Sequence, residues 1–153
     1  CSLFIVTACT SDGECRKDRA VKLGVDLKQN TWNETSDKYI ESNLSSPITV
    51  FGIGNDSLIA DNKVFTQTLL LPLKNFSDST EFVFQVQDQT ADTVNFIYEN
   101  EDYFLSFECG SLVFHTLKEV KFSRNYIDSV VVKNDYVAIG NSSANIKIYF
   151  KNR

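Results

Sequence analysis

The feature that most constrains the fold is a two-residue alternation of apolar and polar side chains that recurs along the chain. In residues 21–28, valine and leucine alternate with lysine, glycine and aspartate. The same period recurs in residues 82–87, 94–98 and 146–150. Because successive side chains of a β-strand point to opposite faces, this pattern predicts strands with one face buried.

Turn signals separate these apolar segments, as in residues 52–56, 75–79 and 134–135. No stripe with the 3.6-residue period of a helix is found. Many short strands at intervals of about 8 to 12 residues are typical of an antiparallel sandwich. We therefore expect an all-β chain with one immunoglobulin-like β-sandwich over residues 19–151, and a small β-barrel is the alternative.

Two segments interrupt the alternation. Residues 30–46 are polar and are predicted to form a long loop or irregular edge. Residues 99–102, Glu-Asn-Glu-Asp, are predicted to form a hairpin loop that leads into a strand over residues 103–109. Cys109 would then lie on the buried face of that strand.

The acidic balance of the chain limits its partners. The net charge is −5, the sequence pI is about 4.8, and no basic cluster is present. This argues against nucleic acid as a partner, because phosphate backbones are bound by clustered lysine and arginine. No cofactor is expected. The 12 Phe, 6 Tyr and 1 Trp supply enough apolar bulk for a core.

The N-terminus has the form of a lipoprotein signal. An apolar run ends in Val-Thr-Ala-Cys at residues 6–9, which places small residues before a cysteine. We expect residues 1–8 to be a signal-peptide remnant, Cys9 to be the lipid-attachment site and residues 9–18 to be a tether. The protein would then be held at a membrane by its acyl chains. The alternative is that residues 2–7 form a buried first strand.

The remaining cysteines are Cys15 and Cys109, because Cys1 and Cys9 belong to the signal region. In an exported chain, two remaining cysteines most simply form a disulfide. Closing so long a loop contributes about 4 to 5 kcal/mol in the chain-entropy model. A metal site or a reactive thiol is the alternative, but the chain has no Cys-x-x-Cys and a single histidine, His115.

An ordered set of short motifs follows the two early cysteines. The motifs are GIGNDS at residues 52–57, LPL at 71–73, STEFVF at 79–84, DTVNF at 92–96, CG at 109–110 and IDSV at 127–130. With Cys9 and Cys15, this order resembles a family of short Bacteroidetes lipoproteins of unknown function. The resemblance implies an exported, lipid-anchored, β-rich protein of the outer membrane, facing either the periplasm or the outside, with no assigned activity.

The same resemblance implies O-glycosylation at Asp-Ser/Thr followed by an aliphatic residue or threonine. The candidate hydroxyls are Ser57, Ser79, Thr93 and Ser129. The alternative is that this tripeptide describes a turn that leads into a strand.

Three acidic residues in one predicted loop, Glu99, Glu101 and Asp102, form a candidate calcium site, because calcium takes carboxylate oxygens. The alternative is a solvated hairpin on an acidic protein.

Trp32 and Tyr39 stand in a polar segment and form a candidate platform on which a sugar ring could stack. The alternative is that they cap one end of the sandwich.

No catalytic residues are predicted. The chain lacks a Gly-x-Ser-x-Gly elbow, and His115 stands in a predicted strand. We therefore expect a non-enzymatic accessory module that binds a protein or glycan partner. One alternative is a structural or assembly subunit that acts by strand pairing at an exposed edge. The other is a glycan-active hydrolase.

Overall fold

The computed structural model describes residues 20–54, 58–139 and 143–152. The expected signal remnant, Cys9 and the tether lie outside these residues. Every regular element in the described part of the chain is a β-strand. That part contains no helix with the length and apolar character needed to cross a membrane.

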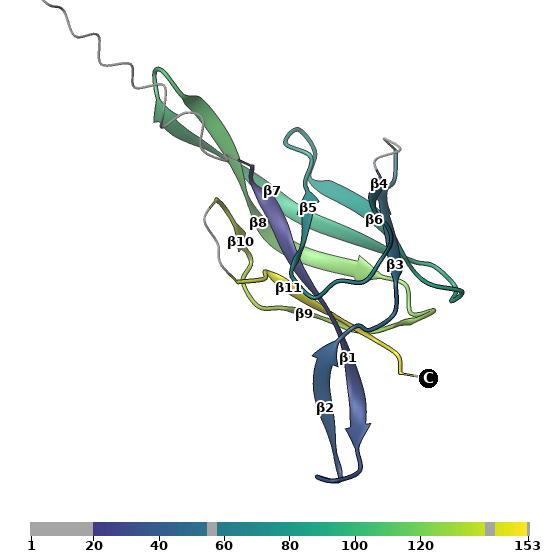
Figure 1. Cartoon of the computed structure of the whole chain (residues 1–153). Coiled ribbons are helices and arrows are strands. Elements are labelled where there is room, and N and C mark those ends of the chain that lie inside the picture. The colour runs from purple at the N-terminus through teal and green to yellow at the C-terminus, as the bar shows by residue number, and fades with distance from the viewer. Residues whose placement is uncertain (1–19, 55–57, 140–142, 153) are drawn as a thin grey trace, which may run out of the picture.

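The described strands form two sheets that face each other (Figure 1). Sheet A contains β1 Lys22–Asn33, β2 Lys38–Asn43, β5 Leu69–Pro72, β9 Ile127–Val132 and β11 Ile146–Phe150. Its order is β2-β1-β11-β9, and β5 also pairs with β1. Sheet B contains β3 Ile48–Gly52, β4 Leu58–Lys63, β6 Ser79–Val86, β7 Asp92–Ser106, β8 Gly110–Phe122 and β10 Tyr136–Val137. Its order is β10-β8-β7-β6-β3-β4.

Alternate side chains of both sheets fill the space between them. Leu23 and Val25 of β1 are fully buried, and Phe82 and Phe84 of β6 are at most 2% exposed. All four belong to one hydrophobic core cluster. Burying an apolar side chain of this size contributes about 1.5–3 kcal/mol, so the predicted alternation selects the inward face of each strand.

The predicted all-β sandwich is confirmed, and the alternative small barrel is not, because the described strands form two separate sheets. The chain's first described strand, β1, runs parallel to its last, β11, with Val25 opposite Ile146. Sheet B places β6, β7 and β8 side by side as a meander. This order departs from the ABED and CFG sheets of an immunoglobulin constant domain.

The long loop predicted over residues 30–46 is wrong, whereas the alternative, an edge, agrees with the place of β2 at the end of sheet A. β1 continues to Asn33, turns, and returns as β2, with Trp32 opposite Tyr39. The turn is held by the Asn33 Oδ1, which accepts the N–H groups of Thr35 at 2.9 Å and Ser36 at 3.1 Å. Both faces of this hairpin are largely exposed, so no apolar alternation marks it.

The prediction of a hairpin loop at residues 99–102 is also wrong. β7 runs on to Ser106, and the turn lies at residues 107–109, before Gly110. Gly110 has φ +74°, a left-handed conformation that glycine adopts without strain. Cys109 therefore lies half-buried in a turn rather than on a buried strand face. The apolar alternation stops where the hairpin leaves the sandwich.

A buried carboxylate joins the two sheets where β8 crosses to β9. Asp92 is 1% exposed, and its Oδ1 accepts the Ser123 hydroxyl at 2.6 Å and the Asn125 N–H at 2.7 Å. Its Oδ2 accepts the N–H groups of Tyr126 at 2.7 Å and Ile127 at 2.8 Å. Asp92 thereby satisfies the backbone of the crossover from sheet B to sheet A.

A buried amide makes a comparable tie beside β10. Asn145 Oδ1 accepts the Gly24 N–H of β1 at 3.0 Å. Its Nδ2 donates to the carbonyls of Asn134 at 3.1 Å and Tyr136 at 3.0 Å. A side chain at Gly24 would meet the backbone of Ala144 at 3.3 Å, so glycine allows this close approach.

Candidate binding surface on the β1–β2 arm

The hairpin of β1 and β2 extends beyond the sandwich. The last pair between β1 and β11 is Gln29 with Phe150, whereas β1 and β2 remain paired to Asn33 and Lys38. We call residues 30–41 the β1–β2 arm. It projects from the sandwich at the end opposite to the tip of the β7–β8 hairpin (Figure 1).

The arm carries an exposed aromatic pair. Trp32 is 46% exposed and Tyr39 is 69% exposed, and their ring centroids are 5.0 Å apart. The rings meet edge to face at 71°. Because they are not coplanar, they do not form one flat platform, and each ring offers its own face to a ligand. The alternative, a cap on the sandwich, does not fit a pair that stands on a projecting hairpin.

Each ring of the pair lines an open hollow. One, of about 610 Å³, is lined by Asn30, Tyr39, Asp128, Phe150, Lys151 and Asn152. The other, of about 530 Å³, is lined by Thr31, Trp32, Asn33, Glu34, Ile40 and Ser42. The first hollow combines the rings of Tyr39 and Phe150 with amide and charged groups, and the second combines the Trp32 ring with amide, hydroxyl and charged groups. Such a combination stacks on the apolar face of a sugar and hydrogen-bonds its hydroxyls.

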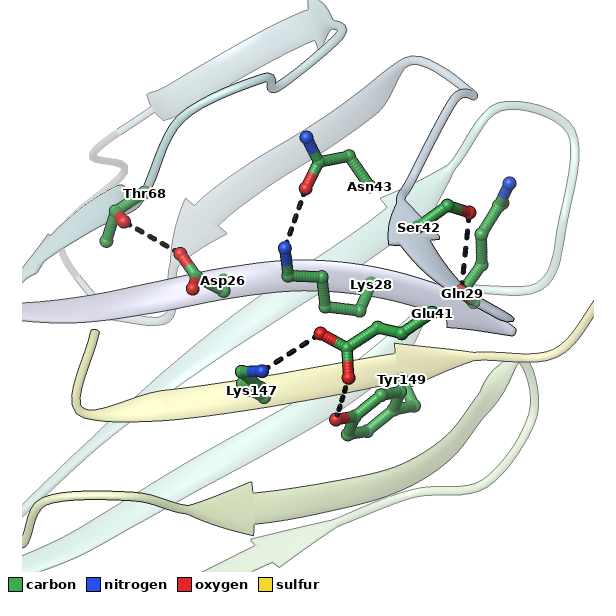
Figure 2. A network of polar contacts seen from close by, with 9 residues as sticks. All are labelled: Asp26, Lys28, Gln29, Glu41, Ser42, Asn43, Thr68, Lys147 and Tyr149. Carbon is green, nitrogen blue, oxygen red and sulfur yellow. Dashed lines mark hydrogen bonds and ion pairs between the residues drawn. The ribbon is translucent and has the colours of Figure 1, made fainter. Parts of the chain in front are cut away.

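A polar network fixes the base of the arm to the last strand (Figure 2). Glu41 of β2 reaches across β1, and its carboxylate accepts from Lys147 Nζ at 2.9 Å and from the Tyr149 hydroxyl at 2.7 Å. Beside it, Lys28 Nζ donates to Asn43 Oδ1 at 2.8 Å. These side chains hold three neighbouring strands, β2, β1 and β11, in one register.

The network also sets the charges at the base of the arm. The pKa of the Glu41 carboxyl is lowered, first by the hydrogen bond from Lys147 and then by that from Tyr149. The bond to Glu41 in turn raises the pKa of Lys147 and of Tyr149. At neutral pH, the carboxylate therefore faces a charged ammonium group and a protonated phenol.

Sequence reasoning did not identify Glu41, Lys147 and Tyr149 as a group. The alternation of residues 146–150 does place Lys147 and Tyr149 on the outward face of the last strand. Their contact with Glu41 depends on the parallel pairing of β1 and β11, which no local pattern in the sequence encodes.

The acidic residues proposed for calcium are not gathered into a loop. Glu99, Glu101 and Asp102 all lie in β7, where Glu99 and Glu101 share one face and Asp102 faces the other way. Glu99 Oε2 lies 3.5 Å from Lys118 Nζ. Among the described residues, no group of three or more His, Cys, Asp or Glu side chains is placed to hold a metal ion.

The candidate O-glycosylation hydroxyls lie on strands. Ser79 opens β6, Thr93 is the second residue of β7, and Ser129 lies within β9. Thr93 is exposed, whereas Ser79 and Ser129 are half-buried. Ser57 lies outside the described residues.

The aspartates that precede these hydroxyls differ in access. Asp78 and Asp128 are exposed, and an enzyme could therefore read them beside Ser79 and Ser129. Asp92, which precedes Thr93, is buried under its four donors. In the folded protein, an enzyme could therefore reach Thr93 but not the aspartate of its motif.

His115 is fully buried in β8. Its Nδ1 lies 2.7 Å from Asn100 Oδ1, and its ring packs edge to face on Tyr98 with centroids 4.8 Å apart. Its Nε2 has no hydrogen-bond partner among the described residues. Burial lowers the pKa of His115, so the imidazole is neutral at pH 7 and is shielded from any substrate.

Comparison with known proteins identifies a matching family model. A family model described as a family of unknown function, DUF6452, matches residues 47–150. No curated protein and no solved structure matches the chain. The matched range contains β3 to β11, whereas β1 and β2 precede it. Because it covers more than half of the 153 residues, the chain belongs to the family of unknown function DUF6452.

Proposed function

We propose that the protein is an exported outer-membrane lipoprotein of the Bacteroidetes type that binds a glycan partner without catalysing a reaction. The Val-Thr-Ala-Cys sequence at residues 6–9 supports a lipid anchor on Cys9. The first described strand begins at Lys22, so residues 10–21 would separate the domain from the membrane. The face of the outer membrane is either the periplasmic or the external one.

A disulfide between Cys15 and Cys109 is part of this proposal. Cys109 is disulfide-bonded, and no other cysteine lies among the described residues. With Cys9 committed to lipid and Cys1 in the signal remnant, Cys15 is the remaining partner. The bond would tie the tether to the tip of the β7–β8 hairpin, and it requires an oxidising compartment.

The exposed Trp32–Tyr39 pair, with the hollow that each ring lines, supports the proposed binding function. Single exposed aromatic residues are ordinary on protein surfaces, but a projecting arm that presents two rings beside amide groups suits a sugar chain. Tyr39 lines the first hollow and Trp32 lines the second. A sugar unit could therefore stack on either ring beside the polar groups of its hollow.

The binding proposal is tested on an array of bacterial and host glycans. Trp32→Ala and Tyr39→Ala should each weaken binding about tenfold, because a lost aromatic contact costs about 0.5–1.5 kcal/mol plus the buried area. Phe76→Ala is the matched control, because Phe76 is 100% exposed but lies in the β5–β6 loop. Equal binding by all three variants would contradict the assignment of the arm.

The anchor is tested by labelling cells with radioactive palmitate. Label should appear in the wild type and be absent from Cys9→Ala. Thiol counting on the denatured protein should find no free thiol at Cys15 or Cys109. Intact mass of the native protein should exceed that of polypeptide plus lipid if Ser57, Ser79, Thr93 or Ser129 is glycosylated.

A second candidate function, strand addition, is favoured by the free edge of β2. Within the described residues, β2 pairs with β1 on one side and with no strand on the other. An extended segment of a partner could pair there. The N–H of Tyr39 points away from β1, because hydrogen-bonded pairs alternate along the β1–β2 ladder. Loss of binding in Tyr39→Pro but not in Tyr39→Ala would favour strand addition, whereas loss in both variants would favour the glycan.

A further inference from the structure

A second set of exposed aromatic rings lies at the tip of the β7–β8 hairpin. Phe107 is 99% exposed and Phe104 is 57% exposed, and their rings meet edge to face with centroids 5.3 Å apart. Phe76, in the β5–β6 loop, is 100% exposed. Neighbouring exposed rings of this size indicate a surface that is covered in the working protein.

The described chain begins at the same end of the molecule. A groove of about 470 Å³ runs from Ala20 and Val21, at the start of β1, to Phe76 and to Leu112 and Val113 of β8. Ala20, the first described residue, therefore lies beside the β7–β8 hairpin. The β1–β2 arm lies at the opposite end (Figure 1).

The tether would bring this tip close to the lipid. From Cys9 to Ala20, a fully extended chain spans at most about 40 Å. With Cys15 joined to Cys109, the free tether shortens to the six residues after Cys9, about 20 Å. Phe107 is two residues from Cys109 in sequence, so it would lie within reach of the membrane surface.

The charge of the tip selects the kind of membrane. Residues 101–114 include Glu101, Asp102 and Glu108 and no lysine or arginine. These carboxylates would be repelled by anionic lipid, whereas zwitterionic headgroups carry no net charge. The weak attraction of two phenyl rings is sufficient here, because the anchor holds them at high effective concentration near the bilayer.

We propose that the β7–β8 tip, through Phe104 and Phe107, rests in the interface of a zwitterionic phospholipid membrane. This contact would orient the domain so that the β1–β2 arm points away from the membrane. The inference rests on the lipid anchor of the proposed function. It adds a second, non-covalent contact and a defined orientation.

The test places a fluorescent reporter at the tip of the acylated full-length protein. Trp32 is the sole tryptophan of the chain, so wild type reports on the distal arm. The variant Trp32→Phe/Phe107→Trp reports on the tip, and Trp32→Phe/Phe104→Trp is a second reporter. Each protein is reconstituted into phosphatidylcholine vesicles that contain a lipid with a nitroxide near its headgroup.

Both tip reporters should lose most of their emission and shift to shorter wavelength, whereas wild type should keep its emission. Replacing part of the phosphatidylcholine with phosphatidylglycerol should reduce the quenching of the tip reporters. Vesicle flotation and intact mass report acylation separately. An acylated, vesicle-bound protein with unquenched tip reporters would overturn the inference alone, including the case in which a protein partner covers the tip. An unacylated protein would overturn the proposed anchor and this inference together.

Discussion

Replacing Asp92 with asparagine should destabilise the fold, although the side chain keeps almost the same size and shape. Asparagine retains one carbonyl oxygen, but its NH₂ group must then face two N–H donors. In the present arrangement those donors are the buried N–H groups of Tyr126 and Ile127, which bond to Oδ2 at 2.7 and 2.8 Å. Flipping the amide would instead let its NH₂ group donate to the Ser123 hydroxyl oxygen, and the Asn125 N–H alone would lose its acceptor.

One unsatisfied donor costs about 1–3 kcal/mol, so Asp92→Asn with the flipped amide should lower the free energy of unfolding by about 2 kcal/mol. The assay is urea unfolding followed by circular dichroism. Asp88→Asn is the matched control, because Asp88 is exposed in the adjacent turn and its change should stay within about 0.5 kcal/mol. A loss of less than about 1 kcal/mol in Asp92→Asn would refute the claim that this carboxylate holds the crossover.

Three further predictions concern pH and backbone. Because burial lowers the folded-state pKa of His115, the unfolded state binds more protons as pH falls below about 6.5, and stability is lost. The ordinary pKa of histidine is about 6.5. Between pH 7.5 and 5, the free energy of unfolding of His115→Gln should therefore depend less on pH than that of wild type. Glu41 has a lowered pKa, so its contribution is present at neutral pH and lost as pH falls below 4.5. Hydrogen exchange in the β1–β2 arm should therefore be faster in Glu41→Gln than in wild type at pH 7, and the difference should vanish in acid. Gly110→Ala should cost about 1–2 kcal/mol in urea unfolding, because φ is +74° there.

The sandwich could be predicted from the sequence because its strands are amphipathic. Leu23 and Val25 alternate with polar residues since one face of β1 packs on sheet B, and that packing leaves a period of two in the sequence. The same strand beyond Gln29 is exposed on both faces, so the period vanishes although the strand continues. Because the period is missing beyond Gln29, the sequence predicted a loop where the strand continues.

The candidate binding surface was less predictable than the fold. Trp32 and Tyr39 stood out because large aromatic residues are unusual in a polar segment. The contact of Glu41 with Lys147 joins residues 106 positions apart and depends on the parallel pairing of β1 and β11. Asp92 belonged to a recognisable motif, but its burial depends on a crossover between sheets that the motif does not encode.

The stability of the two hairpins that leave the sandwich needs a physical explanation. A two-stranded ribbon is marginally stable in water, and cross-strand aromatic pairs are one way to stabilise it. That need explains a contact such as Tyr103 stacked on Phe114 at 22°, where Phe114 is 5% exposed. It also explains the contact between Trp32 and Tyr39, but it does not explain why Tyr39 stays 69% exposed or why Phe107 stays 99% exposed. These exposed rings therefore lie at both ends of the molecule, and the stability of the hairpins does not account for their exposure. A bound glycan would cover Tyr39 at one end, and a membrane would cover Phe107 at the other.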